Sequence, residues 1–345
     1  MARDPKGRLR AAWTLALLTT VCAELTFTAV AVPFAWLLLP LLLVMYGAGV
    51  LLVRELAVRA GGGWPGLVLL GLAYQLAEDG LGLQALTSPN IYGAADWGWR
   101  ALGANWSYWA SQVGVHVVFS VLVPVLLTDL VFPGRRGRPY LRTGGLVGVG
   151  LLAVLGVVGL RVVISGTEDP GYLAPWGWTA AFVVAIAVLG LLALRVAPGF
   201  AVPGPRPAAA APRPPVVAAA AGSGTVVFLA LLIPPGLGPR TLVADGVPPA
   251  IPLVAAALVG LGLAWATLRW SAAPGWGDRH RIWLAGGILV GHTAFMLPGP
   301  PANAVTGGVV IVLEVALLAL LARHVARRPG ARHGPREHQV GIHPL

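Results

Sequence analysis

Charged side chains are scarce in this sequence. Asp, Glu, Lys and Arg make up only 11% of the 345 residues, whereas 57% are hydrophobic. Soluble domains carry about 25% charged residues, so this composition excludes the soluble globular class. The chain is long enough for about ten membrane-crossing segments of roughly 20 residues each. The composition therefore predicts an all-α, polytopic transmembrane helical bundle.

Cysteine is almost absent, because Cys22 is the only one in the chain. A single cysteine excludes an intramolecular disulfide and a zinc site built on several cysteines. The sequence also has no Gly-x-Ser-x-Gly elbow, Walker loop or His-Glu-x-x-His motif. Soluble-type hydrolase, nucleotidase and zinc-finger chemistry therefore have no support. The sequence leaves any cofactor undetermined.

Ten apolar segments are long enough to cross the hydrocarbon layer. Connections rich in Pro and Gly separate the later ones, and such connections do not continue a helix. The expected spans are residues 11–32, 34–53, 64–84, 107–132, 143–165, 176–197, 216–236, 248–270, 281–298 and 302–323.

The basic residues fall almost entirely on one side of these expected spans. With the N-terminus inside, all but three of the 24 Lys and Arg residues lie on the inner side, the exceptions being Arg100, Arg161 and Arg240. This asymmetry is the positive-inside pattern of membrane proteins. It predicts both termini in the cytoplasm and a multi-pass protein of the cell membrane, and it attributes the net charge of +11 to topology instead of nucleic-acid binding.

An Ala/Pro-rich stretch divides the chain into two membrane halves. We expect a first half at 1–200 with spans one to six, a semi-rigid cytosolic linker at 201–217, a second half at 218–323 with spans seven to ten, and a basic, His-containing cytosolic tail at 324–345. The lipid bilayer is the expected partner, and the tail is expected to lie against anionic lipid headgroups. The oligomeric state is left open.

The expected outer loop from Thr87 to Trp106 is rich in aromatic residues, including Tyr92, Trp97 and Trp99. Aromatic side chains commonly form a belt at the membrane interface. The alternative interpretation is a re-entrant or interfacial helix that covers a site opening to the outside.

Few ionisable residues fall inside the expected spans, and each is a candidate functional residue because a charge in lipid is costly without a partner. The third and fourth spans carry polar stripes with helical spacing, Tyr74 with Glu78, Gln75 with Asp79, and Gln112 with His116 and Ser120. At 1.5 Å per residue, Glu78 and His116 both belong to the outer half of the membrane, and Glu24 lies near the middle of the first span. The full set is Glu24, Glu78, Asp79, His116, His292 and Glu314.

A carboxylate beside an imidazole is compatible with three functions. The leading hypothesis is a transport or permease-like protein in which Glu24, Glu78, His116 and His292 bind substrate or protons. The alternative is a metal-dependent intramembrane enzyme that uses Glu78, Asp79 and His116 for catalysis. The third is a membrane scaffold, in which interhelical hydrogen bonds only hold the bundle together.

The pair Glu78-Asp79 followed by His116 resembles part of the CAAX-processing and bacteriocin-processing membrane proteases. The motifs of that family are Glu-Glu-x-x-x-Arg, Phe-x-x-x-His and a later His-x-x-x-Asn element. Glu78 matches the first glutamate, Asp79 stands at the second, and His116 matches the histidine. Leu83 occupies the arginine position and Gln112 the phenylalanine position. The resemblance implies an intramembrane site in which these three residues take part in catalysis.

The pattern His-x-x-Phe occurs at His116 and again at His292, each time near mid-membrane and each time followed by a proline. Inverted-repeat transporters build a central site from such paired elements. Glu24 and Glu78 have no acidic counterparts in the second half, so the sequence leaves open whether the two halves form a true repeat.

Overall fold

A computed structural model describes residues 5–200 and 209–328. Part of the linker expected at 201–217 and most of the tail expected at 324–345, including His333, His338 and His343, lie outside the described residues.

The N-terminal region is a broken helix that turns back on itself. The backbone at Phe27 is not helical (φ −127°, ψ −89°), and Pro33 begins the returning segment. A proline is tolerated there because it occupies the first helical position. The elements are α1 (Pro5–Thr20), the π-helical η1 (Val21–Leu25), α2 (Thr28–Ala31), η2 (Pro33–Leu38), α3 (Leu39–Leu42), the π-helical η3 (Leu43–Gly47) and α4 (Ala48–Ala60).

The middle of the chain holds two long helices joined by a folded loop. The loop includes a two-stranded antiparallel hairpin in which Arg100 pairs with Asn105 and Ala101 with Ala104. The elements are α5 (Gly63–Gln75), the π-helical η4 (Leu76–Gly82), η5 (Ile91–Gly93), α6 (Ala94–Trp97), β1 (Arg100–Ala101), β2 (Ala104–Asn105), α7 (Trp106–Gln112), the π-helical η6 (Val113–Leu122), α8 (Val123–Val131) and η7 (Pro133–Arg135).

The rest of the described chain contains six long α-helices together with several short helical segments. They are α9 (Thr143–Gly159), η8 (Leu160–Ser165), α10 (Gly166–Glu168), α11 (Trp176–Leu191), η9 (Leu192–Val196), η10 (Ala197–Phe200), α12 (Pro214–Leu232), η11 (Pro235–Leu237), α13 (Ala250–Ser271), α14 (Asp278–Ala294) and α15 (Pro301–Ala326).

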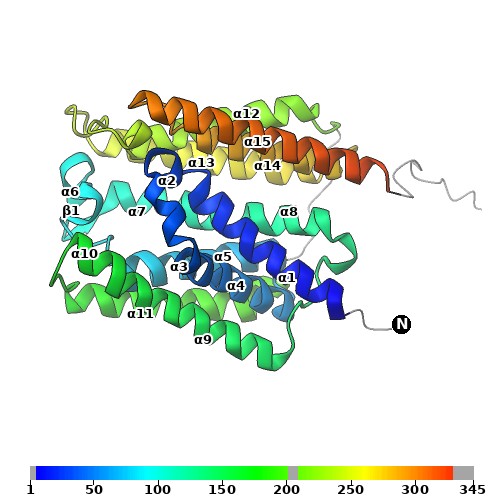
Figure 1. The fold of residues 1–345 in the computed structure, drawn as a ribbon, viewed down its shortest axis with the longest axis horizontal. Coiled ribbons are helices and arrows are strands. Elements are labelled where there is room, and N and C mark those ends of the chain that lie inside the picture. Colours follow the sequence, from blue (N-terminus) through cyan, green and yellow to red (C-terminus); the bar gives the residue numbers. More distant parts are fainter. Residues whose placement is uncertain (1–4, 201–208, 329–345) are drawn as a thin grey trace, which may run out of the picture.

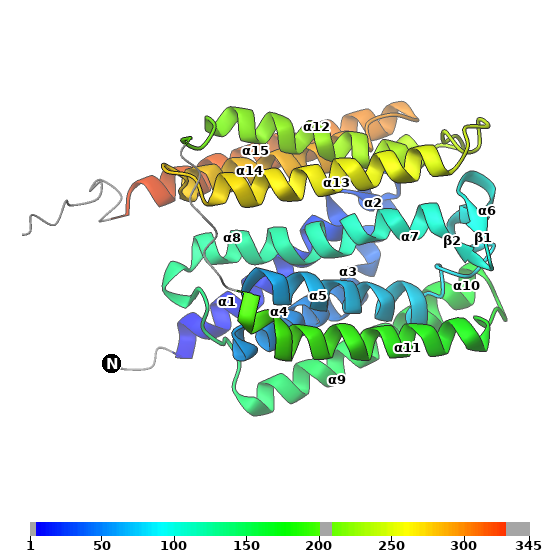
Figure 2. The ribbon, with the colours of Figure 1, turned by 180° about the vertical axis from the view of Figure 1, so that it is seen from behind.

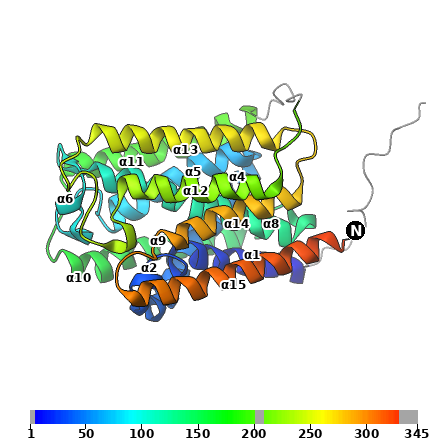
Figure 3. The same ribbon diagram turned by 90° about the horizontal axis from the view of Figure 1, so that it is seen from above.

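The continuous rod formed by α7, η6 and α8 lies between two helical layers. One layer contains α1, α4, α5, α9 and α11, and the other contains α12 to α15 (Figures 1 and 2). The second layer is flat, with its helices side by side in the order α13, α12, α14, α15 (Figure 3). In the most apolar stretch of the central rod, 72% of the residues are buried. In the most apolar stretches of α13 and of α15, only 11% are buried. The rod is therefore the core of the bundle.

The outward surfaces of the peripheral helices are apolar. Leu151 on α9 is 63% exposed, Leu261 on α13 is 69% exposed and Val312 on α15 is 68% exposed. Such surface is unfavourable in water but is compatible with lipid chains. The predicted all-α membrane bundle is confirmed.

Seven continuous helices in the described residues are long and apolar enough to cross a membrane, namely residues 33–60, 106–131, 143–168, 176–199, 214–232, 250–271 and 301–326. The other three expected spans, at 11–32, 64–84 and 281–298, correspond to α1 with η1 and α2, to α5 with η4, and to α14. The start of α1 and the end of α15 lie at one end of the bundle, and α6 and β1 lie at the other (Figure 1). The count of ten spans and the cytoplasmic placement of both ends stay predictions.

Helices α12 and α14 approach closely along glycines. A Cβ atom added at Gly287 would lie 2.3 Å from the carbonyl oxygen of Ala218, and one at Gly291 would lie 2.5 Å from that of Gly222. No side chain fits in so short a gap, so these glycines let the two backbones touch. By contrast, an added Cβ at Gly148 would meet nothing within 4 Å.

Candidate functional site

The candidate site lies where four helices widen into π turns. Glu24 is in η1, Tyr46 is in η3, Glu78 and Asp79 are in η4, and His116 is in η6. A π turn replaces the usual i→i+4 hydrogen bond by an i→i+5 bond, as in the 2.7 Å bond from the Leu83 N–H to the Glu78 carbonyl. Such turns occur often at functional positions, where they re-aim side chains.

His116 is held between two carboxylates. Its Nδ1 lies 2.9 Å from Oε2 of Glu78, and its Nε2 lies 3.1 Å from Oδ2 of Asp79. All three side chains are buried, with at most 4% of the side chain exposed. The Glu78 contact is a short ion pair, although neither of its two atoms makes a hydrogen bond of good geometry in the described structure.

Two tyrosines and one glutamine complete the coordination of the carboxylates. The Tyr74 hydroxyl donates to Oε1 of Glu78 at 2.5 Å, and the Tyr108 hydroxyl donates to Oδ1 of Asp79 at 3.1 Å. The Gln75 amide donates to Oδ2 of Asp79 at 3.2 Å. The four-residue spacing from Tyr74 to Glu78 and from Gln75 to Asp79 places each donor beside its acceptor on the same helix.

Gly49 leaves the space that the Tyr74 ring occupies. A Cβ atom added at Gly49 would lie 2.2 Å from the ring. Any side chain there would displace Tyr74 from Glu78, so the glycine on α4 positions a residue on α5. The sequence does not indicate this requirement, because it depends on the packing of two helices.

Glu24 joins the site through Tyr46. The Tyr46 hydroxyl donates to Oε1 of Glu24 at 3.1 Å, and the Tyr46 ring stacks on His116 with ring centroids 5.9 Å apart. The second carboxylate oxygen of Glu24 is buried without a hydrogen-bond partner in the described structure. Three carboxylates and one imidazole therefore share one buried region. We name this set, Glu24, Glu78, Asp79 and His116, the acidic centre.

His292 lies apart from the acidic centre, in an aromatic stack. Its ring is 4.1 Å from that of Phe27 and 3.9 Å from that of Phe119, and neither of its nitrogens has a hydrogen-bond partner in the described structure. Phe119 belongs to the first His-x-x-Phe pattern and His292 to the second, so the two patterns touch. Next to His292, Thr293 donates to Oε1 of Glu314 at 2.9 Å.

The aromatic outer loop is folded. It lies next to the acidic centre, because Tyr108 of α7, the helix that follows the loop, donates to Asp79. The Asn105 amide donates to the carbonyls of Ala85 and Ser88 at 2.8 and 2.6 Å. The Ser88 hydroxyl donates to Asp169 at 2.5 Å, which ties the loop to the segment after α10. The hydroxyl of Thr241 donates to the carbonyl of Trp97, which also ties the loop to the second half.

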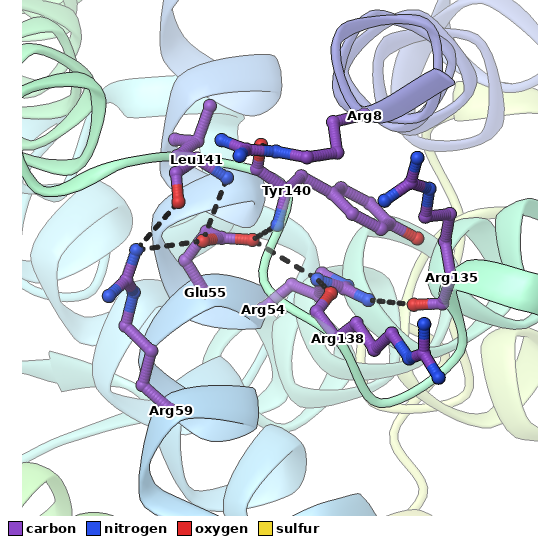
Figure 4. Close-up of polar contacts among 8 residues, drawn as sticks. All are labelled: Arg8, Arg54, Glu55, Arg59, Arg135, Arg138, Tyr140 and Leu141. Atoms are coloured by element: carbon purple, nitrogen blue, oxygen red, sulfur yellow. Dashed lines mark hydrogen bonds and ion pairs between the residues drawn. The ribbon is translucent and has the colours of Figure 1, made fainter. Parts of the chain in front are cut away.

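A second buried charged network, missed by the sequence analysis, lies at the opposite end of the bundle (Figure 4). Glu55 is fully buried and accepts from the Tyr140 N–H at 2.6 Å, from the Leu141 N–H at 3.1 Å and from Arg54 at 3.1 Å. Arg54 also donates to the carbonyls of Arg138 and Arg135 at 2.8 and 3.2 Å. Adjacent opposite charges just after an apolar run were the available signal. We name Arg54, Glu55 and Tyr140 the loop anchor.

The Tyr140 ring completes the loop anchor by stacking under Arg54, whose guanidinium carbon lies 3.4 Å from the ring centroid. Burial raises the pKa of the Tyr140 hydroxyl to about 12, so the tyrosine is neutral at ordinary pH. A neutral ring under a guanidinium is a favourable cation–π contact. Arg8 of α1 donates to the Tyr140 carbonyl at 2.9 Å and holds the same loop from the other side.

The acidic centre has the chemistry of a proton-exchange or cation-binding site. In the part of the chain that the structure describes, no group of three or more His, Cys, Asp or Glu side chains is arranged to hold a metal ion. Both ring nitrogens of His116 instead face carboxylate oxygens.

The fold and this centre define a multi-pass membrane protein with a buried ionisable centre. Residues 14–328 match the model of an uncharacterized membrane protein family, and the chain belongs to that family. No curated protein and no solved structure matches the chain. The matching family model is not that of the CAAX-processing proteases, so that resemblance is not confirmed.

Proposed function

We propose that this protein is a transport or permease-like protein in which the acidic centre binds and releases protons or a cationic substrate. The observation that carries the proposal is the imidazole of His116 held between Glu78 and Asp79 inside the membrane. A buried ionisable cluster of this kind is costly to maintain, and its usual role is in an ion, proton or substrate pathway.

The charge balance of the acidic centre supports the proposal. A protonated His116 neutralises one carboxylate, which leaves two more negative charges if Glu24, Glu78 and Asp79 are all ionised. Like charges in a buried site disfavour full ionisation. Bound protons or a bound cation therefore neutralise the excess negative charge of the centre. Binding of this kind is the property that a coupled transporter requires.

The hydrogen-bond pattern supports a route for protons or a cation from the acidic centre toward the outer loop. Asp79 contacts His116 on one side and the Tyr108 hydroxyl on the other. Tyr108 is in α7, which begins directly after the hairpin of the outer loop. Tyr46 and Glu24 extend the centre in the other direction, into the broken first helix.

The same proposal places the protein in the cell membrane with both ends in the cytoplasm. It rests on the distribution of Lys and Arg, because inner loops of membrane proteins carry the excess positive charge. The contact of the basic tail with anionic headgroups is part of this proposal.

Reconstitution into proteoliposomes tests the function. Capacitive currents on a supported membrane are recorded while a panel of cations, amines, amino acids and organic acids is applied with and without a pH gradient. We expect a current for at least one solute class that is lost in His116→Ala and in Glu78→Gln, but kept in Glu168→Gln, which changes an exposed carboxylate.

Two results would replace the proposal. Near-stoichiometric zinc in the purified protein that is lost in His116→Ala would favour the intramembrane enzyme. Absence of any current, together with full folding and unchanged proton binding in both variants, would favour a scaffold.

A further inference from the structure

A cavity of about 190 Å³ opens beside the loop anchor, at the end of the bundle opposite the outer loop. Its polar wall contains Arg54, Arg136, Arg281 and Asp129. These residues come from four separate segments, namely α4, the connection after η7, α14 and α8. The cavity therefore lies between the two membrane halves and has a basic wall.

Arg54 is already used by the loop anchor, whereas Arg136 and Arg281 are incompletely paired. Arg136 lies 3.9 Å from Oδ2 of Asp129 and 3.6 Å from Oδ1 of Asp278, and both distances exceed the hydrogen-bond range. Arg281 makes one short contact, 2.7 Å from Nη1 to Oδ1 of Asp278. The exposed fraction is 40% for the Arg136 side chain and 33% for that of Arg281. Guanidinium N–H groups facing the cavity are thus left for an anionic ligand.

Asp129 adds a second requirement on the ligand. Its Oδ1 atom is buried and makes no hydrogen bond of good geometry in the described structure, although the Tyr140 hydroxyl lies near the Asp129 carboxylate. A buried acceptor without a donor costs about 1–3 kcal/mol in general. A ligand with a hydroxyl or amino group beside its anionic group can donate to Asp129 while the anionic group binds the arginines. Phosphate esters that also carry such a donor have this combination.

The opposite wall of the cavity is apolar. It includes Trp64, Leu67 and Val125, and Trp64 is 45% exposed. Exposed tryptophan at the end of a helix is typical of the membrane interface. A wall with arginines on one side and apolar side chains on the other matches a phospholipid, whose phosphate is followed by acyl chains.

We propose that this cavity binds a phosphate-bearing anion, with a phospholipid headgroup as the source that the apolar wall favours. Arg136 and Arg281 contact the phosphate, since guanidinium groups bind phosphate oxygens in pairs. Asp129 accepts from the hydroxyl or amino group of the headgroup. Because Arg281 belongs to the second half and Arg136 to the first, the bound anion links the two halves at this end of the bundle.

The test measures ligand-induced stabilisation of the detergent-purified protein through its tryptophan fluorescence on heating. Three ligands are compared: phosphatidylglycerol, phosphatidylcholine and inorganic phosphate. We expect phosphatidylglycerol to raise the melting temperature at a lower concentration than the other two. The variant Arg136→Ala/Arg281→Ala is expected to weaken this effect about tenfold or more, because each charge-assisted contact is worth about a tenfold change or more.

The matched control is Arg195→Ala/Arg269→Ala, which removes the same charge from exposed positions in η9 and α13 that line neither the cavity nor the tail. It is expected to respond as the unchanged protein does. Equal stabilisation by inorganic phosphate, lost in the cavity variant, would support the site and assign it to free phosphate. An unchanged response in the cavity variant, or an equal loss in the control, would overturn the proposal.

Discussion

The two buried charged networks of the first half differ in how completely their carboxylates are paired, although the Tyr140 hydroxyl of the loop anchor also has no hydrogen-bond partner in the described structure. In the loop anchor, Glu55 accepts two backbone N–H groups and a guanidinium. In the acidic centre, Oε2 of both Glu24 and Glu78 and Nδ1 of His116 have no hydrogen-bond partner in the described structure. Buried polar groups in native proteins are nearly always paired, so a buried carboxylate oxygen without a hydrogen bond needs an explanation, and an exchangeable proton or ion provides one. We therefore interpret the loop anchor as structural and the acidic centre as functional.

The largest effect is expected at the loop anchor. Glu55→Ala leaves Arg54 and two backbone N–H groups buried without their acceptor, and breaking such a pair costs about 3–5 kcal/mol. Thermal or denaturant unfolding in detergent measures the change. Arg59→Ala is the control, because its 3.5 Å contact with Glu55 is partly exposed and is worth at most about 1 kcal/mol. Equal effects of the two substitutions would contradict the structural role.

A smaller loss of stability but a complete loss of transport is expected from His116→Ala. The carboxylates left behind can take up a proton and donate to each other, whereas the backbone N–H groups at Glu55 have no such adjustment. We expect the free energy of unfolding to fall by about 1–3 kcal/mol, the cost of an unpaired buried group. If His116→Ala destabilises the protein as much as Glu55→Ala, the acidic centre is as structural as the loop anchor.

Tyr46→Phe is expected to act on function more than on stability. It removes one hydrogen bond to Glu24, which is worth about 1 kcal/mol, while keeping the ring that stacks on His116. The pH dependence of transport should change, because Glu24 loses the donor that connects it to the centre. Tyr172→Phe, a change in the segment before α11, should leave the pH dependence as it is. A pH profile that stays the same in both variants would remove Glu24 from the centre.

The smallest effect is expected from His292→Phe. Both nitrogens of His292 are unpaired between two phenylalanine rings, and a ring of similar size without polar atoms fits this stack. We expect a change in the free energy of unfolding within about 1 kcal/mol and unchanged transport. Loss of transport with intact folding would instead return His292 to the substrate- or proton-binding residues expected from the sequence.

The helical membrane class and the association of Glu78, Asp79 and His116 followed from composition and from four-residue spacing. Both depend on local pattern, which a sequence carries. The role of Gly49 and the separation of His292 from the acidic centre depend on how distant helices pack. Glycines four residues apart look alike in the sequence, yet Gly287 and Gly291 touch α12 while Gly148 faces open space.

The loop anchor could not be recognised for a related reason. Positive-inside counting treats Arg54, Arg135 and Arg138 only as charges on the inner side. Their function in the fold comes from backbone carbonyls and N–H groups of the connection after α8, which converge on α4. The adjacent charges of Arg54 and Glu55 mark the position, but the backbone contacts that define the loop anchor leave no residue-type signal.

Proton exchange by the acidic centre is the central claim, and infrared difference spectroscopy in lipid tests it most directly. Spectra are recorded between mildly acidic and mildly alkaline buffer for the unchanged protein, Glu78→Gln and Glu55→Gln. We predict a titrating carboxyl band that Glu78→Gln weakens and Glu55→Gln leaves in place. Absence of a titrating band, or a band that is unchanged in Glu78→Gln, would contradict the claim.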